Sequence, residues 1–388
     1  MEKSSVKKGL PAFIGVAAVW MGTHFGPGVA SGTQLNVYYV QYGIPGICVT
    51  LVAMGLLAFA LYCSMEFSRI YKTYDYQSWV EKIFGFKWFV ILFDISFLVT
   101  ILTALGGSLN AVATLLVNFT GLNYWIGVGI VIVCSMLLCA YGAELVRNAS
   151  SYMMFIVVGI LAVIIILLGI FGDGDLAGSI ANQKTNLPNV NWGKALWSAV
   201  IYASFQSTVV ANIASVADGL EDRKASKKAA ITGFIANAAL LIVLSLALLS
   251  YTNVYAITKE PLPFYSLLER LGFNWLTGVY ILIVFIAVLS TVVGFAFAGV
   301  ARFSKYYRSK RQGAKHSLAD AIFVGLMLLA CAFASRFGIV ALVSTGYRIL
   351  GYLNLPIIIL PAIILGGRKI SKKYLKENHI TAPGVDLS

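Results

Sequence analysis

Charged residues and histidines are scarce in this sequence, and both shortages restrict its function. Only 12% of the 388 residues are charged, about half the share in soluble domains, whereas 59% are hydrophobic and the mean hydropathy is +0.84. The five cysteines lie in apolar runs and form neither a disulfide framework nor a paired metal motif. This composition indicates a polytopic membrane protein. Since the sequence has only three histidines, no Walker motif and no convincing Ser-His-Asp set, we expect that it is not an enzyme and holds no cofactor.

Long apolar runs are abundant. About 20 apolar residues cover the hydrocarbon core of a bilayer, and ten segments of about that length predict an all-α protein with ten transmembrane helices. The predicted spans lie near residues 10–39, 43–71, 87–117, 123–141, 145–171, 192–217, 228–254, 274–303, 317–334 and 336–366. Between the seventh and eighth, the segment 261–270 predicts a short amphipathic helix on the outer surface.

A polar stretch at 172–191 divides the chain into two halves of five predicted spans each. We expect a first repeat at 10–171, an extracellular linker at 172–191 and a second repeat at 192–366. Short cytoplasmic segments precede and follow them, at 1–9 and 367–388.

Basic residues give the predicted sidedness. With the N-terminus inside, 23 of the 29 lysines and arginines fall on the inner side. This asymmetry is typical of cytoplasmic loops and predicts that both ends of the chain lie in the cytoplasm, in a multi-pass protein of the plasma membrane. It also accounts for the net charge of +13 by contact with the lipid bilayer, so no nucleic-acid partner is needed.

The first span contains helix-breaking residues. Gly26, Pro27 and Gly28 interrupt an apolar run, with His24 beside them. Irregular backbone inside a membrane is tolerated only where protein or water satisfies its polar groups, so the break predicts a binding site. If the helix resumes near Val29 or Ala30, its free N–H groups stabilise a carboxylate and the carbonyls before the break hold a cation. The alternative is a small-residue packing seam with a proline kink.

The sixth span opens the second half and carries a polar run, Tyr202 to Thr208, in its middle. Paired interruptions at corresponding positions of two halves are the sequence sign of an inverted-repeat transporter. The run therefore predicts a second discontinuous helix. The alternative is hydrogen bonding between helices by serine and threonine.

The residues from Gly26 to Gln34 (GPGVASGTQ), followed by Tyr42-Gly43, resemble the first-helix motif of the YkvI-like membrane proteins. These form a branch of the amino acid–polyamine–cation superfamily with the LeuT fold. The relatives often carry glutamate where this chain has Gln34. The resemblance implies a five-plus-five inverted repeat, discontinuous helices 1 and 6, and alternating access around a site at the membrane midplane.

The resemblance also implies a sodium site. Sodium-coupled members hold Na⁺ between carbonyls of the broken first helix and an Ala-x-x-hydroxyl-hydroxyl pattern in the eighth. On this sequence the implied ligands are the carbonyls of Gly22 and Phe25, the carbonyl of Ala287, and the hydroxyls of Ser290 and Thr291. An oxygen-only set suits a hard cation.

A substrate pocket is implied around the break, bordered by the third and sixth spans. The residues expected to line it are Thr23, His24, Gly26, Gly28, Val29, Ala30, Ser31, Gly107, Asn110, Tyr202, Phe205 and Gln206. For Asn110 an interhelical hydrogen bond is the alternative.

Four ionisable residues in the spans are candidates for coupling or gating. His24 is a proton carrier, a pH sensor or a polar wall of the pocket. Glu66 and Asp94 lie near the inner ends of their spans, and this position favours structural pairing or a cytoplasmic gate over a proton relay. Arg348, at mid-span, favours a salt bridge over binding a second anionic group of the substrate.

Together these features predict a secondary active transporter, a symporter of an amino acid or a related small carboxylate or zwitterion, coupled to Na⁺. Two alternatives stay open. One is a proton-coupled transporter that uses His24, and the other is a channel or non-transporting ligand sensor on the same scaffold.

Overall fold

The computed structural model describes residues 11–141, 143–307, 318–381 and 384–385, and this part of the chain contains helices and no strands. The helices of the first half are α1 (Ala12–His24), α2 (Pro27–Ala30), α3 (Thr33–Tyr38), η1 (Val40–Tyr42), α4 (Ile44–Tyr71), α5 (Tyr76–Phe84), α6 (Phe89–Thr120), α7 (Tyr124–Tyr141) and α8 (Ala143–Phe171).

The second half follows two short helices in the predicted linker and also consists mainly of long helices. Its helices are α9 (Leu176–Ala181), α10 (Gln183–Asn186), α11 (Trp192–Gln206), η2 (Ser207–Val209), α12 (Val210–Val216), η3 (Ala217–Gly219), α13 (Arg223–Leu249), η4 (Ile257–Lys259), α14 (Pro263–Leu271), α15 (Asn274–Tyr307) and α16 (Leu318–Ser335). The last segment is α17 (Ile339–Ala341), η5 (Leu342–Gly346), α18 (Tyr347–Asn354), η6 (Leu355–Ile359), η7 (Ala362–Gly366) and α19 (Gly367–Lys369), followed by α20 (Lys372–Glu377).

Each predicted span coincides with helical structure. Within the described residues, six helical stretches are long and apolar enough to cross a membrane: 44–71, 89–120, 192–219, 223–249, 274–300 and 339–369. Four apolar helices are shorter, at 12–24, 124–137, 156–171 and 322–335. The helical, multi-pass character is therefore confirmed, and the number of ten spans stays a prediction.

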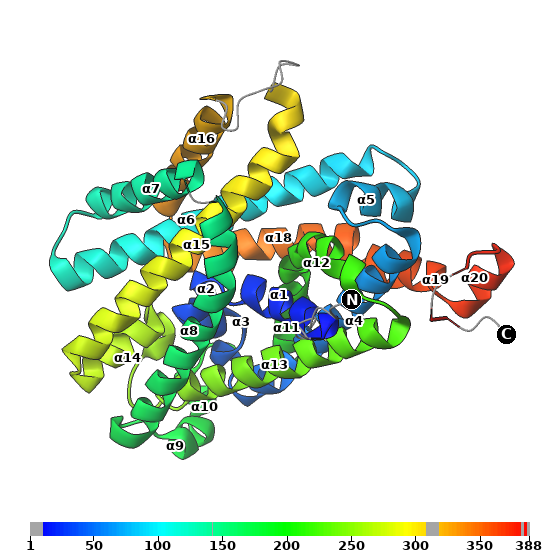
Figure 1. Ribbon diagram of the computed structural model, residues 1–388. Coiled ribbons are helices and arrows are strands. Elements are labelled where there is room, and N and C mark those ends of the chain that lie inside the picture. The colour runs from blue at the N-terminus through cyan, green and yellow to red at the C-terminus, as the bar shows by residue number, and fades with distance from the viewer. Residues whose placement is uncertain (1–10, 142, 308–317, 382–383, 386–388) are drawn as a thin grey trace, which may run out of the picture.

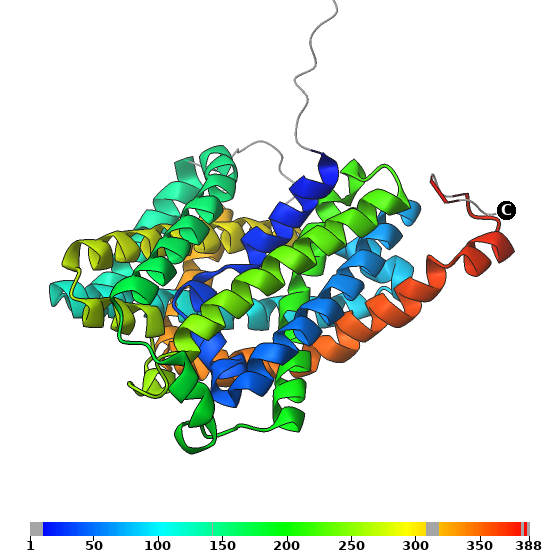
Figure 2. The same ribbon diagram turned by 90° about the horizontal axis from the view of Figure 1, so that it is seen from below.

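The broken first segment lies in the middle of the molecule. Figure 1 shows α1, α2 and α3 in blue, with α13 and α4 on one side and α6 and α15 on the other. α4 packs along α11 and α13, α1 along α13, α6 along α16 and α7, and α11 along α18. The start of α1 and helix α20 lie toward one side of the molecule, and α9, α10 and α14 lie toward the opposite side (Figures 1 and 2).

The outward faces of the long helices are apolar. Phe333 of α16 is 69% exposed, Ile235 of α13 is 60% exposed and Leu282 of α15 is 58% exposed. Such side chains in water would form an unfavourable apolar surface, whereas lipid chains accept them. Polar residues begin helices where the chain returns to water: the side chains of Asp75, Asn191 and Asp222 accept N–H groups three residues ahead in α5, α11 and α13.

The sixth segment is less interrupted than expected. α11 passes into a 3₁₀ turn, η2, and then into α12 without any extended residue. The sequence here has no glycine or proline to break the helix. Its hydroxyls bond back to the same segment, Ser204 to the Val200 carbonyl at 2.7 Å and Ser207 to the Ser204 carbonyl at 2.6 Å. The prediction of a discontinuous helix 6 is therefore corrected to a local change of helix type.

The amphipathic helix predicted at 261–270 is present as α14, but its apolar face is not free. Phe264, Leu267 and Leu268 are fully buried against the rest of the protein. Helix α5 and the three π-helical turns η5, η6 and η7 of the last segment have no counterpart among the elements predicted from the sequence. A π-turn depends on packing around it, and such turns are frequent at functional sites.

Candidate functional site

The first membrane segment is interrupted at the predicted Gly-Pro-Gly sequence. α1 ends at His24, and Phe25 (φ −85°, ψ 56°) and Gly26 (φ −75°, ψ −179°) leave the helical conformation. Pro27 starts α2 at its first position, where the missing N–H of proline removes no helical hydrogen bond. The predicted discontinuity of helix 1 is confirmed.

The helix after the break differs from the expectation. The helix resumes at Pro27, two residues before the expected Val29, and α2 ends after four residues. Gly32 ends it by adopting a left-handed conformation (φ 86°), and this turn packs against α14, where the Phe264 N–H donates to the Ser31 carbonyl at 3.1 Å. A single turn has little macrodipole, so only its individual N–H groups are available for an anion.

Several backbone groups at the break have no partner. The N–H groups of Val29 and Ala30 both donate to the Gly26 carbonyl at 3.1 Å. Within the described part of the chain, no hydrogen bond reaches the carbonyls of Gly22, Thr23, His24 and Phe25 or the N–H groups of Gly26 and Gly28. Gly22 and Thr23 are exposed and Gly26 is half-buried, whereas His24, Phe25 and Gly28 are buried, and buried backbone polar groups are nearly always paired. This cluster is therefore suited to a ligand, with oxygens for a cation and N–H groups for an anion.

His24 joins the end of α1 to two other helices. Its buried ring places Nδ1 2.8 Å from Oδ1 of Asn237 in α13 and Nε2 2.8 Å from the hydroxyl of Tyr202 in α11. Asn237 Nδ2 donates to the Gly233 carbonyl at 2.7 Å, so its Oδ1 is the acceptor and His24 Nδ1 carries a proton. His24 Nε2 then accepts from Tyr202, and the network fits a neutral imidazole.

Five aromatic rings fill the space between α3, α11 and α18. The Tyr202 ring lies 5.4 Å from Tyr38 and 4.9 Å from Tyr39, and Phe205 stacks on Tyr347 at 4.7 Å with an interplanar angle of 11°. All five are at least nine-tenths buried. The structure thus brings the predicted residues Tyr202 and Phe205 together. The other three rings were missed because aromatic residues in apolar runs read as ordinary core.

The predicted sodium-binding segment lies on α15, and α15 packs beside α2. The Tyr280 hydroxyl donates to the Ala30 carbonyl at 3.1 Å. Further along α15, the Thr291 hydroxyl donates to the Ala287 carbonyl at 2.9 Å. The side chain of Ser290 lies outside the described residues. The structure places the two helices together, and the ion site stays a prediction.

Asn110 and Gly107 contact the last two membrane segments. Asn110 Nδ2 donates to the Ser335 carbonyl at 3.0 Å and the Tyr124 hydroxyl at 3.1 Å, and its Oδ1 accepts from the Ile339 N–H at 2.9 Å. These are the interhelical hydrogen bonds that the alternative reading of Asn110 expects. A Cβ built on Gly107 would stand 3.8 Å from Cγ1 of Ile339, so this glycine lies next to the start of the last segment.

Three predicted polar residues bond close to the break. The Ser31 hydroxyl donates to the Gly28 carbonyl at 3.2 Å, and the exposed Thr23 hydroxyl donates to carbonyls of its own helix at 3.0 Å. Gln206 Nε2 lies 3.4 Å from the Tyr202 hydroxyl. Val29 and Ala30 are fully buried. Substrate contact by all of these residues stays a prediction.

Both acidic residues named for coupling or gating are paired. Buried Glu66 accepts from Arg69 at 2.8 and 2.9 Å, from Arg223 at 2.9 Å and from a serine of α13 at 3.0 Å, which joins α4 to α13. Asp94 accepts from Arg302 at 2.6 Å and joins α6 to α15. The expected structural pairing is confirmed for both.

Arg348 differs from these two. It lies exposed on α18, and none of the ion pairs found among the described residues includes it. One helical turn after Arg348, the ring of Tyr352 packs on Trp197 of α11, with 6.2 Å between the two ring centroids. The expected salt bridge is not found in this part of the chain.

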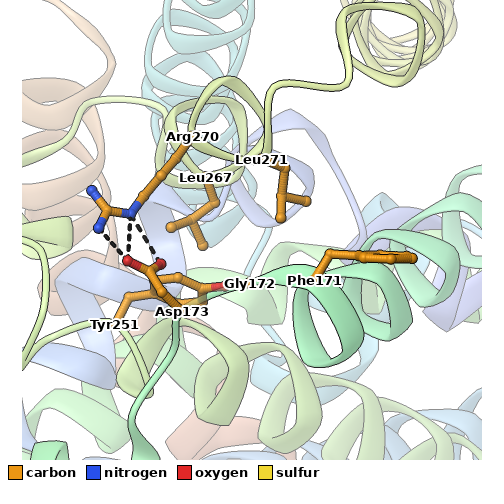
Figure 3. A pocket seen from close by; sticks show the side chains of 7 residues that line it. All are labelled: Phe171, Gly172, Asp173, Tyr251, Leu267, Arg270 and Leu271. Carbon is orange, nitrogen blue, oxygen red and sulfur yellow. Dashed lines mark hydrogen bonds and ion pairs between the residues drawn. The ribbon is translucent and has the colours of Figure 1, made fainter.

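A pocket on the side of the linker was not anticipated. Figure 3 shows Asp173, in the segment between α8 and α9, accepting hydrogen bonds from Arg270 of α14, with Tyr251 beneath them. The Arg270 guanidinium lowers the pKa of the Asp173 carboxyl. The pair links the start of the second half to α14. It could not be found from the sequence because the two residues are far apart along the chain.

Comparison with known proteins agrees with this architecture. The chain is 24% identical over 348 residues to the membrane protein YkvI of Bacillus subtilis, covering 88% of this chain and 93% of YkvI. The chain is thus similar to YkvI over most of its length. No family model matches it.

Three solved structures share the fold. A manganese transporter of Eremococcus coleocola has a TM-score of 0.65 at 11% identity, covering 94% of this chain and 80% of its own. A Na⁺-coupled sialic acid symporter has a TM-score of 0.61 at 15% identity, covering 92% and 79%. Mhp1 in its inward-facing conformation has a TM-score of 0.53 at 13% identity, covering 95% and 77%. The resemblance to YkvI and the LeuT-type fold are confirmed.

Proposed function

We propose that the protein is a secondary active transporter that works by alternating access around the break between α1 and α2. It moves an amino acid or a related small carboxylate or zwitterion together with Na⁺. It spans the plasma membrane ten times, with two five-helix repeats at 10–171 and 192–366 and both ends in the cytoplasm. Its partners are the small-molecule substrate and the bilayer.

One observation carries the proposal: unpaired backbone groups gather at a break in the centre of a membrane protein. Irregular backbone at membrane depth is costly, and it persists where it lines a ligand site. The LeuT-type fold supports this interpretation, since the similar solved structures are described as transporters or symporters. The alternative, a small-residue packing seam with a proline kink, does not by itself account for the carbonyls of Gly22 and Phe25, which no hydrogen bond reaches within the described residues.

The sodium site is supported by the position of α15. The bond from Tyr280 to Ala30 fixes α15 beside α2. Ala287 and Thr291 follow Tyr280 by about two and three helical turns, on the helix that flanks the break. Together with the unpaired carbonyls of Gly22 and Phe25 they offer only oxygen ligands, which suits Na⁺.

The N–H groups of Gly26 and Gly28 are the proposed hydrogen-bond donors to a substrate carboxylate. Both lack partners within the described residues, and charge-assisted hydrogen bonds from backbone N–H groups are strong. The expected helix dipole contributes little because α2 is one turn long.

The test uses purified protein in proteoliposomes. A thermal-shift screen of amino acids and carboxylates, with and without Na⁺, first identifies a ligand by its stabilisation of the folded state. Uptake of that ligand is then measured under separate Na⁺ and pH gradients. We expect accumulation only with an inward Na⁺ gradient.

Other outcomes select the alternatives. Accumulation driven by a pH gradient without Na⁺ would assign coupling to protons, with His24 as the candidate carrier. Downhill flux alone would identify a channel, and binding without any flux a sensor. The hydrogen bonds of His24 fit a neutral ring, so protonation would require the Tyr202 hydroxyl to change partner.

A further inference from the structure

The amide of Gln34 lies directly against the break. Gln34 belongs to α3 and is 4% exposed. A Cβ built on Gly28 would stand 2.4 Å from Gln34 Nε2 and 2.8 Å from its Cδ, closer than real contacts allow. Glycine at position 28 is therefore what lets this amide cross the break.

The Gln34 carbonyl oxygen is unpaired. Oε1 is buried, and no hydrogen-bond donor reaches it from the described residues. The amide oxygens of Asn237, Asn110 and Gln41 have donors at 2.8, 2.9 and 2.8 Å. Asn36 Oδ1 is unpaired too, but the Asn36 amide donates to the Ile257 carbonyl of η4 and not to the break. An amide oxygen accepts two hydrogen bonds, and a buried one without any lowers stability.

A buried and unpaired acceptor favours a ligand that donates a hydrogen bond. In small zwitterions the ammonium group is the strongest donor, because its hydrogen bonds are charge-assisted. Gln34 belongs to α3, one of the three helices around the aromatic group that includes the stacked rings of Phe205 and Tyr347, and aromatic faces attract cations. The surroundings of Gln34 Oε1 therefore suit an ammonium group better than a second carboxylate.

We infer that Gln34 Oε1 accepts a hydrogen bond from an ammonium group of the substrate and so determines specificity. The substrate class is then that of amine-bearing zwitterions, and simple carboxylates are excluded. This inference rests on the proposed transport function. It assigns a role to a side chain outside the pocket residues expected from the sequence.

The experiment compares matched ligands on matched variants of the full-length protein. The probes are the amino acid found in the screen and its 2-hydroxy acid, in which a hydroxyl replaces the ammonium group. Gln34→Met removes the acceptor at similar length, Gln34→Glu keeps it, and Gln41→Met makes the same change at a glutamine away from the break. Dissociation constants for both probes and the melting temperature without ligand are measured for each protein.

For the wild type and Gln41→Met, we expect the dissociation constant of the amino acid to be about 10- to 100-fold lower than that of the hydroxy acid. This ratio corresponds to the free energy of one charged hydrogen bond. Gln34→Met loses that preference through weaker binding of the amino acid, and Gln34→Glu retains it. Without ligand, Gln34→Met melts no lower than the wild type, because it removes an unpaired acceptor. This last measurement also shows that the variant folds.

Two results would overturn the inference while leaving transport intact. One is a Gln34→Met variant with the wild-type ratio of affinities, and the other is a wild type that binds the hydroxy acid as tightly as the amino acid. A wild type that binds and transports neither compound class would instead overturn the proposed function.

Discussion

The Nε2 atom of His24 lies 2.8 Å from the hydroxyl oxygen of Tyr202, and this hydrogen bond joins the end of α1 to the middle of α11. The two residues are 178 positions apart. They belong to the first and sixth predicted spans, which open the two halves of the chain. The bond therefore couples the interrupted helix to the helix that occupies the matching position in the second half.

Replacing Tyr202 by phenylalanine tests this bond. The change leaves the buried His24 Nε2 unpaired and should destabilise the protein by about 1–3 kcal/mol, seen as a lower melting temperature in detergent. Tyr39→Phe is the control, because the buried Tyr39 hydroxyl has no partner within the described residues. Equal effects of the two substitutions would contradict a special role for the His24 bond.

The close approach of Gly28 and Gln34 predicts coupling between their substitutions. Gly28→Ala places a methyl group on the Gln34 amide and should cost about 1–3 kcal/mol, as overpacking does. Adding Gln34→Ala removes the collision, so the double variant should be less destabilised than the sum of the single variants. Denaturation of all four proteins measures the coupling. Strict additivity would show that the two side chains do not meet.

Sodium binding can be tested without a substrate. Ala at both Ser290 and Thr291 should abolish the stabilisation that Na⁺ gives to the wild type, because two of the expected oxygen ligands are lost. Thr120→Ala is the control, since that hydroxyl bonds only neighbouring backbone: it donates to the Leu116 carbonyl at 2.5 Å and accepts from the Leu122 N–H at 3.3 Å. A Na⁺-dependent melting shift that survives the double substitution would remove the proposed site.

Glu66→Gln should be strongly destabilising. It leaves the cations of Arg69 and Arg223 without their carboxylate in a buried site, and breaking a buried pair costs about 3–5 kcal/mol. Glu377→Gln, at the exposed pair with Lys373, should change stability by less than about 0.5 kcal/mol. Thermal unfolding of both variants gives the comparison, and similar melting temperatures would contradict the structural role of Glu66.

The pair of Asp173 and Arg270 predicts a local pH dependence. The pKa of Asp173 is lower in the folded state than in the unfolded state. The ion pair therefore stabilises the folded state fully above the ordinary aspartate pKa of about 3.9. This stabilisation is lost as the pH falls through the lower pKa of the folded state. Hydrogen exchange in α14, corrected for intrinsic rates, should therefore increase below about pH 4. Asp173→Asn should show fast exchange across this range. A wild type with constant protection would refute the link between Asp173 and α14.

Much of the fold could be predicted because its causes are local. Runs of about 20 apolar residues must be helical to satisfy their backbone in lipid, and the helices begin and end within a few residues of the expected bounds. Gly26 and Pro27 break α1 by their own conformational limits, independent of neighbours. The polar run near Tyr202 was wrongly predicted to interrupt its helix. Serine hydroxyls can hydrogen-bond the carbonyls of their own helix and leave it continuous.

The sequence by itself determined the membrane class, the helices and the break beside His24, since composition, run length and glycine-proline chemistry act over a few residues. Only the tertiary structure decided the partners: Asn237 and Tyr202 around His24, Arg223 beside Glu66, Asp173 beside Arg270, and the Gln34 amide over Gly28. These contacts depend on which helices pack together. Side chains far apart along the chain meet only then, so no local pattern records them.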